Sequence, residues 1–240
     1  MYRNFIFDLY GTLLDIRTDE QSPAAWRAFA DWMADHDMPL SASVLHRMYN
    51  RRVRLLEQAA SPFAYPEIDL LPVFADLCRH ARPDASDEMI WQAGEAFRRC
   101  STRMLAPYAG SVEVLNTLRR AGKNVYLLSN AQRVFTWREL VETGLLPCFD
   151  DVFISSDALC RKPDPAFFRL LLDKHHLDPC ECVMIGNDST SDIAGAAALG
   201  MDAVYLRTAI SPANDPTPDC RFVFEDGDIR HVLSLLAPAR

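Results

Sequence analysis

The fold is decided by the stretch FIFDLYGTLL, which covers residues 5–14 of the 240-residue chain. The apolar run from Phe5 to Phe7 predicts a short buried strand, and Asp8 follows where this strand gives way to a Gly-Thr turn. Asp often serves only to cap such a turn. In an open parallel sheet, however, ligands bind beyond the carboxyl ends of the strands. A carboxylate at position 8 is therefore well placed for chemistry.

Polar segments follow three later strand-like runs as well. The run Val125–Leu128 is followed by Ser129-Asn130, the run Val152–Ser155 by RKPDP (161–165), and the run Val183–Ile185 by GNDSTSD (186–192). If these strands lie parallel in one sheet, their polar ends meet at one edge. The sequence thus predicts one site built from four separated segments.

These four segments resemble the motifs of the haloacid dehalogenase superfamily of hydrolases. They read Asp-x-Tyr-Gly-Thr-Leu, Ser-Asn, Lys-Pro and Gly-Asn-Asp-x3-Asp-Ile-x-Gly-Ala, in the order of the family. Together with the connecting insert they account for nearly the whole chain. The resemblance implies an α/β fold, with a doubly wound parallel sheet and an inserted α-helical cap domain.

The resemblance also implies how these residues would act. Asp8 would be the nucleophile and would form a covalent intermediate that water then hydrolyses, which requires an ionised, oriented carboxylate. Thr12, Ser129 and Asn130 would bind the transferred group, and Lys162 would neutralise the charge that develops on it. Taken singly, the Ser-Asn pair could be a turn or helix cap, and Lys162 a solvated loop residue.

A phosphorylated substrate would bring negative charge to Asp8, and a hard divalent cation with oxygen ligands would offset the repulsion. By resemblance, Mg2+ would bind Asp8, the backbone carbonyl of Tyr10 and an acid of the last motif. We predict Asp188, although a shifted register selects Asn187. Asp192 would orient a metal-bound water or the motif lysine. Alternatively, both acids of this motif only favour the start of the following helix.

Tyr10 departs from the phosphatases of the family, which usually carry a second aspartate two residues after the nucleophile. A phenol with an unperturbed pKa of about 10 cannot act as a base near neutrality, though it can donate a hydrogen bond. Asp-x-Tyr-Gly-Thr is the form found in the family's 2-haloacid dehalogenases, whose halide leaves without a proton. Those enzymes work without a metal, however, and lack the paired acids found here within residues 186–192.

The first hypothesis is a magnesium-dependent phosphatase for a small phosphorylated metabolite, because a metal site needs several residues to agree whereas Tyr10 is one substitution. Such an enzyme could still cleave acyl or aryl phosphates, whose leaving groups depart easily, or take a proton from Asp15, Arg17 or Asp19. The alternatives are a metal-independent 2-haloacid dehalogenase-like hydrolase, with an ester intermediate on Asp8, and a catalytically weak phosphometabolite-binding protein.

Residues 15–105 are expected to form the cap, inserted between residues 1–14 and 106–240 of the α/β core. Their apolar pattern is helical, and the segment is far longer than a usual connection. Helices are predicted to begin at Ser22-Pro23 and to cover Ser43–Ala60, Leu70–Arg82 and Ser86–Leu105. Aromatic residues at helical spacing are expected in the core of the cap, namely Trp26, Phe29, Trp91 and Phe97.

Beyond residue 106, helices and strands alternate, which implies a parallel sheet with helices on both faces. The proline-rich loop Pro212–Pro218 is expected to carry no site. The net charge of −8 and the absence of a long basic run argue against a nucleic-acid surface. Seven scattered cysteines fit reduced thiols. With neither a signal region nor an apolar run of about 18 residues, we expect a cytoplasmic monomer or homodimer that binds a small molecule and no membrane.

Overall fold

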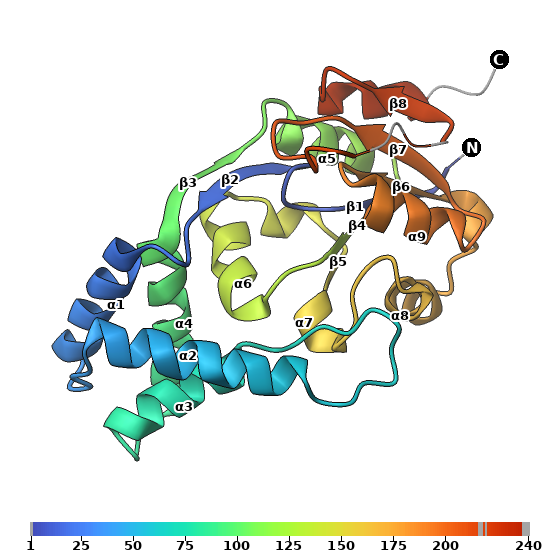
Figure 1. Ribbon diagram of the computed structural model, residues 1–240. Helices are drawn as coiled ribbons and strands as arrows, with labels where there is room; N and C mark the ends of the chain where they lie inside the picture. The colour runs from blue at the N-terminus through green and yellow to red at the C-terminus, as the bar shows by residue number, and fades with distance from the viewer. Residues whose placement is uncertain (1, 216–217, 219, 237–240) are drawn as a thin grey trace.

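The computed structural model describes residues 2–215, 218 and 220–236. Within these residues, six strands form a parallel sheet in the order β5-β4-β1-β6-β7-β8, with β1 in the middle (Figure 1). The strands are β1 (Asn4–Phe7), β4 (Asn124–Ser129), β5 (Asp151–Ile154), β6 (Cys182–Gly186), β7 (Asp202–Leu206) and β8 (Phe222–Phe224). The chain adds strands on both sides of β1, so the predicted doubly wound α/β sheet is confirmed.

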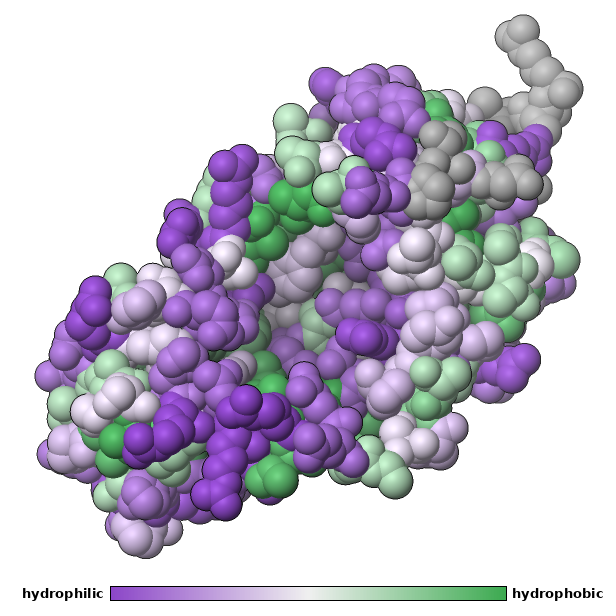
Figure 2. All heavy atoms as spheres, viewed as in Figure 1, coloured by the Kyte–Doolittle hydropathy of each residue, from purple (hydrophilic) through white to green (hydrophobic). Residues whose placement is uncertain are grey.

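A group of helices lies to one side of the sheet and supplies most of a second buried cluster. These helices are α1 (Pro23–Asp35), α2 (Ala42–Glu57), α3 (Leu71–Ala81) and α4 (Asp87–Ser101). With their connections they are called here the helical insert, residues 19–101. The predicted core aromatics Trp26, Phe29 and Phe97 are buried in it, and Trp91 is half-buried against them. The molecular surface is hollowed between the insert and the sheet (Figure 2).

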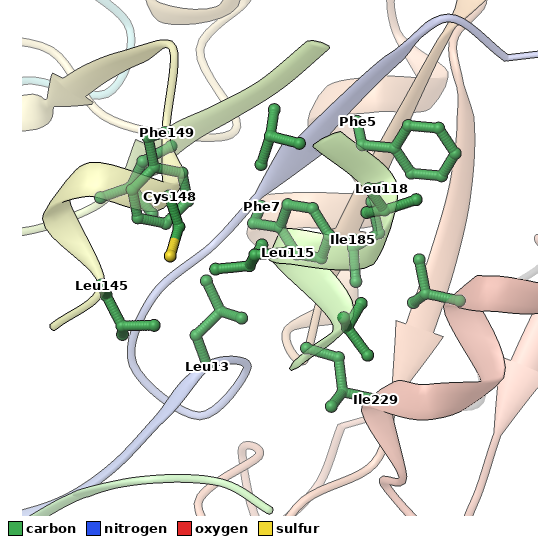
Figure 3. Close-up of a cluster of buried hydrophobic side chains, with 14 of the residues drawn as sticks. Phe5, Phe7, Leu13, Leu115, Leu118, Leu145, Cys148, Phe149, Ile185 and Ile229 are labelled. Carbon is green, nitrogen blue, oxygen red and sulfur yellow. The ribbon is translucent and has the colours of Figure 1, made fainter. Parts of the chain in front are cut away.

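Side chains alternate between the two faces of the sheet along β1. Phe5 and Phe7 are buried on one face, among the residues drawn in Figure 3, and Ile6 is buried on the other. The first face is covered by α5 (Ser111–Arg120), η1 (Leu146–Cys148) and η4 (Ile229–Leu236), and the second by α8 (Pro165–His175) and α9 (Ala194–Ala197). Helices on both faces explain why the central strands are apolar throughout.

Shorter elements complete the chain and place the site. α6 (Arg133–Glu142) follows β4 and contributes Val134 and Phe135 to the cluster of the insert. The remaining helical elements are α7 (Ser155–Ala158), η2 (Pro179–Glu181) and the π-helical turn η3 (Ser189–Ile193). Among the described residues, no helix is both long and apolar enough to cross a membrane.

A two-stranded antiparallel ribbon joins the insert to the sheet, and the sequence prediction missed it. It consists of β2 (Leu14–Thr18) and β3 (Thr102–Pro107). The predicted helix over Ser86–Leu105 is therefore wrong for its last four residues. The helix ends at Ser101, and Thr102 Oγ1 donates to Arg98 O at 2.7 Å. Because each strand of the ribbon has its partner at the far end of the insert, no local pattern marks it.

Candidate active site

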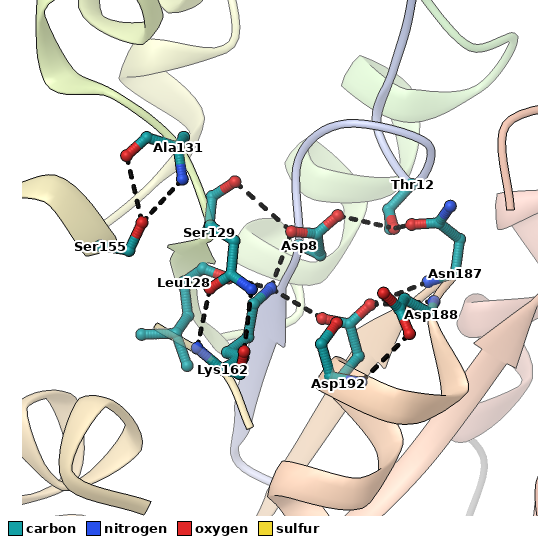
Figure 4. A network of polar contacts seen from close by, with 12 residues as sticks. Asp8, Thr12, Leu128, Ser129, Ala131, Ser155, Lys162, Asn187, Asp188 and Asp192 are labelled. Atoms are coloured by element: carbon teal, nitrogen blue, oxygen red, sulfur yellow. Dashed lines mark hydrogen bonds and ion pairs between the residues drawn. The ribbon is translucent and has the colours of Figure 1, made fainter. Parts of the chain in front are cut away.

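The predicted site residues meet at the carboxyl edge of the sheet (Figure 4). β1 lies between β4 and β6, and Phe7 pairs with Leu127 on one side and Ile185 on the other. The three strands therefore end together. Asp8 directly follows β1, and its backbone N–H donates to Ile185 O at 2.9 Å. The segments after β4 and β6 are consequently placed beside Asp8.

Lys162 is the cation of this site. Its Nζ lies 2.7 Å from Asp8 Oδ1 and 2.7 Å from Asp192 Oδ1, and it donates to Leu128 O at 2.7 Å. The contacts with Asp8 and Leu128 are hydrogen bonds, and the contact with Asp192 is an ion pair. The residue is only 2% exposed. Burial lowers the pKa of Lys162, but the carboxylates of Asp192 and Asp8 outweigh burial, so the pKa is raised. The ammonium is therefore a fixed positive charge against Asp8.

Each carboxylate oxygen of Asp8 has a hydroxyl beside it. Ser129 Oγ lies 3.4 Å from Oδ1, and Thr12 Oγ1 lies 3.4 Å from Oδ2. Asn130 is engaged with the lysine segment instead. Its Oδ1 accepts from Lys162 N at 2.8 Å, and its Nδ2 donates to Lys162 O at 3.0 Å. Asn130 thus fixes the backbone of Lys162, and its contact with substrate stays a prediction.

Asp192 lies behind the lysine and is 1% exposed. Its Oδ2 accepts from the backbone N–H groups of Asn187 and Asp188, both at 3.1 Å. Gly186 leaves room for this arrangement, since a Cβ there would lie 2.2 Å from Asp192 Oδ2. Burial raises the pKa of Asp192, while the Lys162 ammonium opposes that effect. These contacts suit a residue that orients both the lysine and the loop after β6.

Asp188 caps the turn that follows it. Its Oδ1 accepts from Thr190 N at 2.8 Å, from Thr190 Oγ1 at 2.7 Å and from Ser191 N at 3.1 Å. Oδ1 of Asp188 therefore caps this turn, as the capping interpretation of the acid predicted. Asp188 also lines the same cavity as Asp8. Asn187 is 4% exposed, and its Oδ1 lies 3.3 Å from Thr12 Oγ1.

The donor set around the cavity fits a partial coordination sphere for Mg2+. Mg2+ is usually bound through one or two carboxylates, while waters and substrate phosphates complete its shell. Asp8 and Asp188 supply two carboxylates to one cavity, which Tyr10 also lines. Among the residues that the structure describes, no three His, Cys, Asp or Glu side chains are grouped as a complete cage.

The side chain of Tyr10 is held by α6 and by the insert. Its hydroxyl donates to Glu139 Oε2 and lies 2.9 Å from Thr136 Oγ1. Arg98 of α4 lies over the ring, 5.6 Å from its centroid, and donates to Glu139 Oε1 at 2.7 Å. Burial and the Glu139 carboxylate raise the pKa of Tyr10 above its ordinary value. Sequence reasoning missed Glu139 and Arg98, because neither lies in a motif.

A cavity of about 170 Å³ opens beside Asp8. It is lined by polar residues of the motifs and by two residues of a later loop, namely Asp8, Tyr10, Asn130, Lys162, Asn187, Asp188, Ser191, Asp192, Ile210 and Pro212. Pro212, in the loop Pro212–Pro218 that was expected to carry no site, lines this cavity, while Pro216 and Thr217 lie outside the described residues. Buried Asp215 holds this loop, since it accepts from Ser189 N at 3.0 Å and from Tyr205 OH at 2.7 Å.

Residues 2–200 match the sequence model of a family described as haloacid dehalogenase-like hydrolases. This chain belongs to that family. The protein is accordingly a hydrolase, and the resemblance that its four motifs predicted is confirmed at the level of the family. The polar edge of the sheet described above is the place where this hydrolase carries its predicted catalytic residues.

Relatives of this hydrolase are named for both kinds of chemistry. The glyceraldehyde 3-phosphate phosphatase of Pyrococcus furiosus is 25% identical over 201 residues, which cover 84% of this chain and 79% of that protein. The phosphoserine phosphatase of Thermus thermophilus is 30% identical over 185 residues, which cover 74% and 72%. The solved structure of a 2-haloacid dehalogenase from Pseudomonas syringae pv. Tomato has the same fold, with a TM-score of 0.65, 23% identity and coverage of 99% and 100%.

Proposed function

We propose that this hydrolase is a magnesium-dependent phosphatase, which acts on a small phosphorylated metabolite through an aspartyl-phosphate intermediate on Asp8. The observation that carries the proposal is the contact of 2.7 Å between Lys162 Nζ and Asp8 Oδ1, in a polar cavity that Asp188 also lines. A cavity of about 170 Å³ suits a small substrate. The names of the two phosphatase relatives support phosphate as the group transferred.

In the proposed reaction, one carboxylate oxygen of Asp8 attacks the phosphorus, and the bond between phosphorus and the leaving oxygen breaks with its electron pair on that oxygen. Lys162 offsets the charge on the transferring oxygens, and the hydroxyls of Ser129 and Thr12 donate to them. Asp8, the backbone carbonyl of Tyr10 and Asp188 would hold Mg2+, which would supply the positive charge that allows an anionic substrate to approach a carboxylate. Water then attacks the phosphorus of the intermediate, the bond between phosphorus and the Asp8 oxygen breaks with its electron pair on the carboxylate, and the proton of the water leaves with the inorganic phosphate.

The proposed substrates have leaving groups that depart as stable anions, such as acyl or aryl phosphates. The Tyr10 hydroxyl is bonded to Glu139, and its raised pKa makes it a poor proton donor near neutrality. The other donors considered from the sequence, Asp15, Arg17 and Asp19, are not among the residues that line the cavity. A carboxylate or phenolate leaving group needs less help from a proton than an alkoxide does.

We further propose that residues 15–105 act as a cap domain over a core of residues 1–14 and 106–240. The helices of the insert supply most of one buried cluster, to which α6 of the core adds Val134 and Phe135, and this supports treating the insert as a unit. It is joined to the core by the β2–β3 ribbon, and the surface is hollowed between the two parts (Figure 2). Such lids exclude water and select substrates.

A second candidate is a metal-independent 2-haloacid dehalogenase-like hydrolase, with an ester intermediate on Asp8. Tyr10 favours it, because a halide leaves without a proton and needs no general acid at this position. A catalytically weak phosphometabolite-binding protein is the third candidate. It is less well supported, because Lys162, Asp188 and Asp192 are all present around Asp8.

Release of 4-nitrophenol from 4-nitrophenyl phosphate distinguishes these candidates, because this leaving group needs no acid. We expect turnover with Mg2+, loss of turnover with EDTA, and loss of turnover in Asp8→Asn. Chloride release from 2-chloropropionate that persists in EDTA would instead identify the dehalogenase. Binding of phosphorylated ligands without either reaction would leave the third candidate.

A further inference from the structure

The loop between α2 and α3 extends from the insert to the segment that carries Lys162. In Figure 1 it is the teal loop that runs toward α8. Arg161 N donates to Tyr65 O at 3.0 Å, and Glu67 N donates to Leu159 O at 3.0 Å. Between these bonds, Pro66 and Cys160 form an antiparallel bridge. The insert is therefore paired with the backbone directly before Lys162.

Asp164 fixes the same loop on the other side of Lys162. Its Oδ2 accepts from Ala64 N at 3.1 Å and from Tyr65 N at 3.2 Å, while its Oδ1 accepts from Ala166 N at 3.0 Å and caps α8. Asp164 is 6% exposed, although Ala64 and Tyr65 are exposed. Since hydrogen bonds to an ionised acceptor are stronger than neutral ones, Asp164 is the strongest point of this attachment.

Packing adds to these polar contacts. Phe63, the residue before Ala64, lies half-buried against the cluster that α8 forms with the sheet. That cluster contains Phe167 and Phe168 of α8. A side chain of the insert thus packs against the hydrophobic cluster beneath α8, the helix that follows the Lys162 segment. The loop is docked by apolar burial as well as by hydrogen bonds.

We propose that Asp164 is a positioning residue for Lys162, and that the insert loop 61–70 fixes the lysine through it. The loop bonds Arg161 on one side of the lysine and Asp164 on the other, so the insert constrains both neighbours of Lys162 in addition to the two bonds that Asn130 makes to its backbone. If the loop leaves, Lys162 loses these constraints and its contact with Asp8 loosens. The expected effect on turnover rests on the proposed function. The positioning of Lys162 by the loop does not.

Acylation of lysines tests the proposal without any assay of turnover. Lys123, Lys162 and Lys174 are the lysines of the sequence, so a pulse of acetic anhydride followed by mass spectrometry reports on each one. Lys162 is 2% exposed, whereas the side chain of Lys174 is 60% exposed. In the unchanged protein, Lys162 should therefore be protected, and the other two serve as internal references.

Asp164→Asn and Asp164→Ser each keep one oxygen that can cap α8 and remove the second, which binds the insert loop. We expect the acylation of Lys162 to rise at least about tenfold in both, since two hydrogen bonds to a charged acceptor are lost, while the reference lysines stay unchanged. Asp178→Asn is the matched control. Asp178 also precedes a proline and caps a short turn, with its Oδ1 2.9 Å from Cys180 N, and should leave Lys162 protected.

Phe63→Ala tests the proposal from the side of the insert. It should also raise the acylation of Lys162, and it should increase cleavage by elastase after Ala64. If the loop becomes cleavable in these variants while Lys162 stays protected, the loop does not position the lysine and the proposal is wrong. If the unchanged protein turns over 4-nitrophenyl phosphate, the variants in which Lys162 is acylated faster should have a lower kcat, while their KM changes less. An absence of turnover in the unchanged protein would count against the proposed phosphatase alone.

Discussion

Replacing Arg98 with methionine should destabilise the protein much more than replacing a neighbouring arginine of the same interface. Arg98 of the insert donates through Nε to Glu139 Oε1 at 2.7 Å and through Nη1 to Glu20 Oε1 at 3.1 Å. The side chain of Arg98 is 12% exposed and that of Glu139 is 6% exposed, so water screens their contact poorly. Arg98→Met would leave the Glu139 carboxylate buried beside the Tyr10 hydroxyl without a counter-charge.

The expected loss follows from the burial of this pair. Removing one partner of a buried ion pair typically costs about 3–5 kcal/mol, because the remaining charge is uncompensated. Methionine retains most of the apolar stem of Arg98, so the packing loss stays small. The Tyr10 hydroxyl still donates to Glu139 and recovers part of the cost. We therefore expect a fall of about 3 kcal/mol in the free energy of unfolding, at the lower end of that range.

Arg138→Met is the matched control. Arg138 of α6 also reaches α4, with its Nη1 3.1 Å from Glu95 Oε2, but its side chain is 39% exposed. Exposed pairs of this kind contribute about 0–1 kcal/mol. Urea unfolding followed by tryptophan fluorescence measures both variants, since Trp26 lies in the core of the insert. Equal losses in the two variants would refute the argument from burial, and Arg98→Met combined with Glu139→Leu should regain stability over Arg98→Met alone.

Three further changes probe the loops around the cavity and the buried phenols. Gly11→Ala should lower the melting temperature more than Gly144→Ala. Both glycines have positive φ (+88° and +70°), but of the two only Gly11 would bring its Cβ against a side chain, 2.2 Å from Asn187 Nδ2. Equal effects would show that this contact relaxes freely. Asp215→Asn should raise KM for 4-nitrophenyl phosphate more than it lowers kcat, and the reverse would place its effect on the reacting groups. Burial raises the pKa of Tyr10, and burial and Asp215 raise that of Tyr205 to about 12. The pKa of each phenol is higher in the folded protein than the unfolded value of about 10. The resulting contribution to the free energy of unfolding is therefore fully present below pH 10 and is lost as the pH rises through the folded pKa values. Tyrosinate absorbance should therefore appear at higher pH in the folded protein than in urea, and coincident titrations would contradict this.

The sheet and the centre of the site could be predicted because their signals are local. An apolar run such as Phe5–Phe7 marks a buried strand, and the polar residue that follows it marks the end of that strand. Parallel strands share one carboxyl edge, so the order of the motifs is enough to bring Asp8, Lys162 and Asp192 together. No side-chain geometry was needed for that step, since topology alone determines which residues meet.

Features that depend on a distant partner could not be predicted. Residues Thr102–Pro107 form a strand only because Leu14–Thr18 lies beside them, and their own pattern continues that of the preceding helix. Glu139 belongs to a helix whose surface pattern gives no reason to bury an acid. Its burial is compensated by Arg98 and Tyr10, which come from two other parts of the chain. Likewise, Asp215 is only one acid of a polar loop until its contacts with Ser189 and Tyr205 are known.

The choice between phosphate and halide chemistry depends on Asp188 more than on Tyr10. Tyr10 favours the dehalogenase over a phosphatase that needs a general acid, but it does not separate the dehalogenase from a phosphatase whose leaving group departs without a proton. The charge of the substrate does separate these two reactions. The ammonium of Lys162 is already shared between the carboxylates of Asp8 and Asp192, both at 2.7 Å. A phosphate brings more negative charge than a haloacid and so needs a further cation near Asp8.

Asp188→Asn removes charge from that position while an amide oxygen can still cap the turn at Thr190. For a phosphatase we expect turnover of 4-nitrophenyl phosphate to fall by about 10²-fold or more, because the loss of a carboxylate ligand lowers the affinity for Mg2+. A high concentration of Mg2+ should recover part of this turnover. A dehalogenase should release chloride from 2-chloropropionate at nearly the original rate. Full phosphatase activity in this variant, with unchanged dependence on Mg2+, would show that Asp188 is a capping residue alone and would move the metal to the Asn187 register.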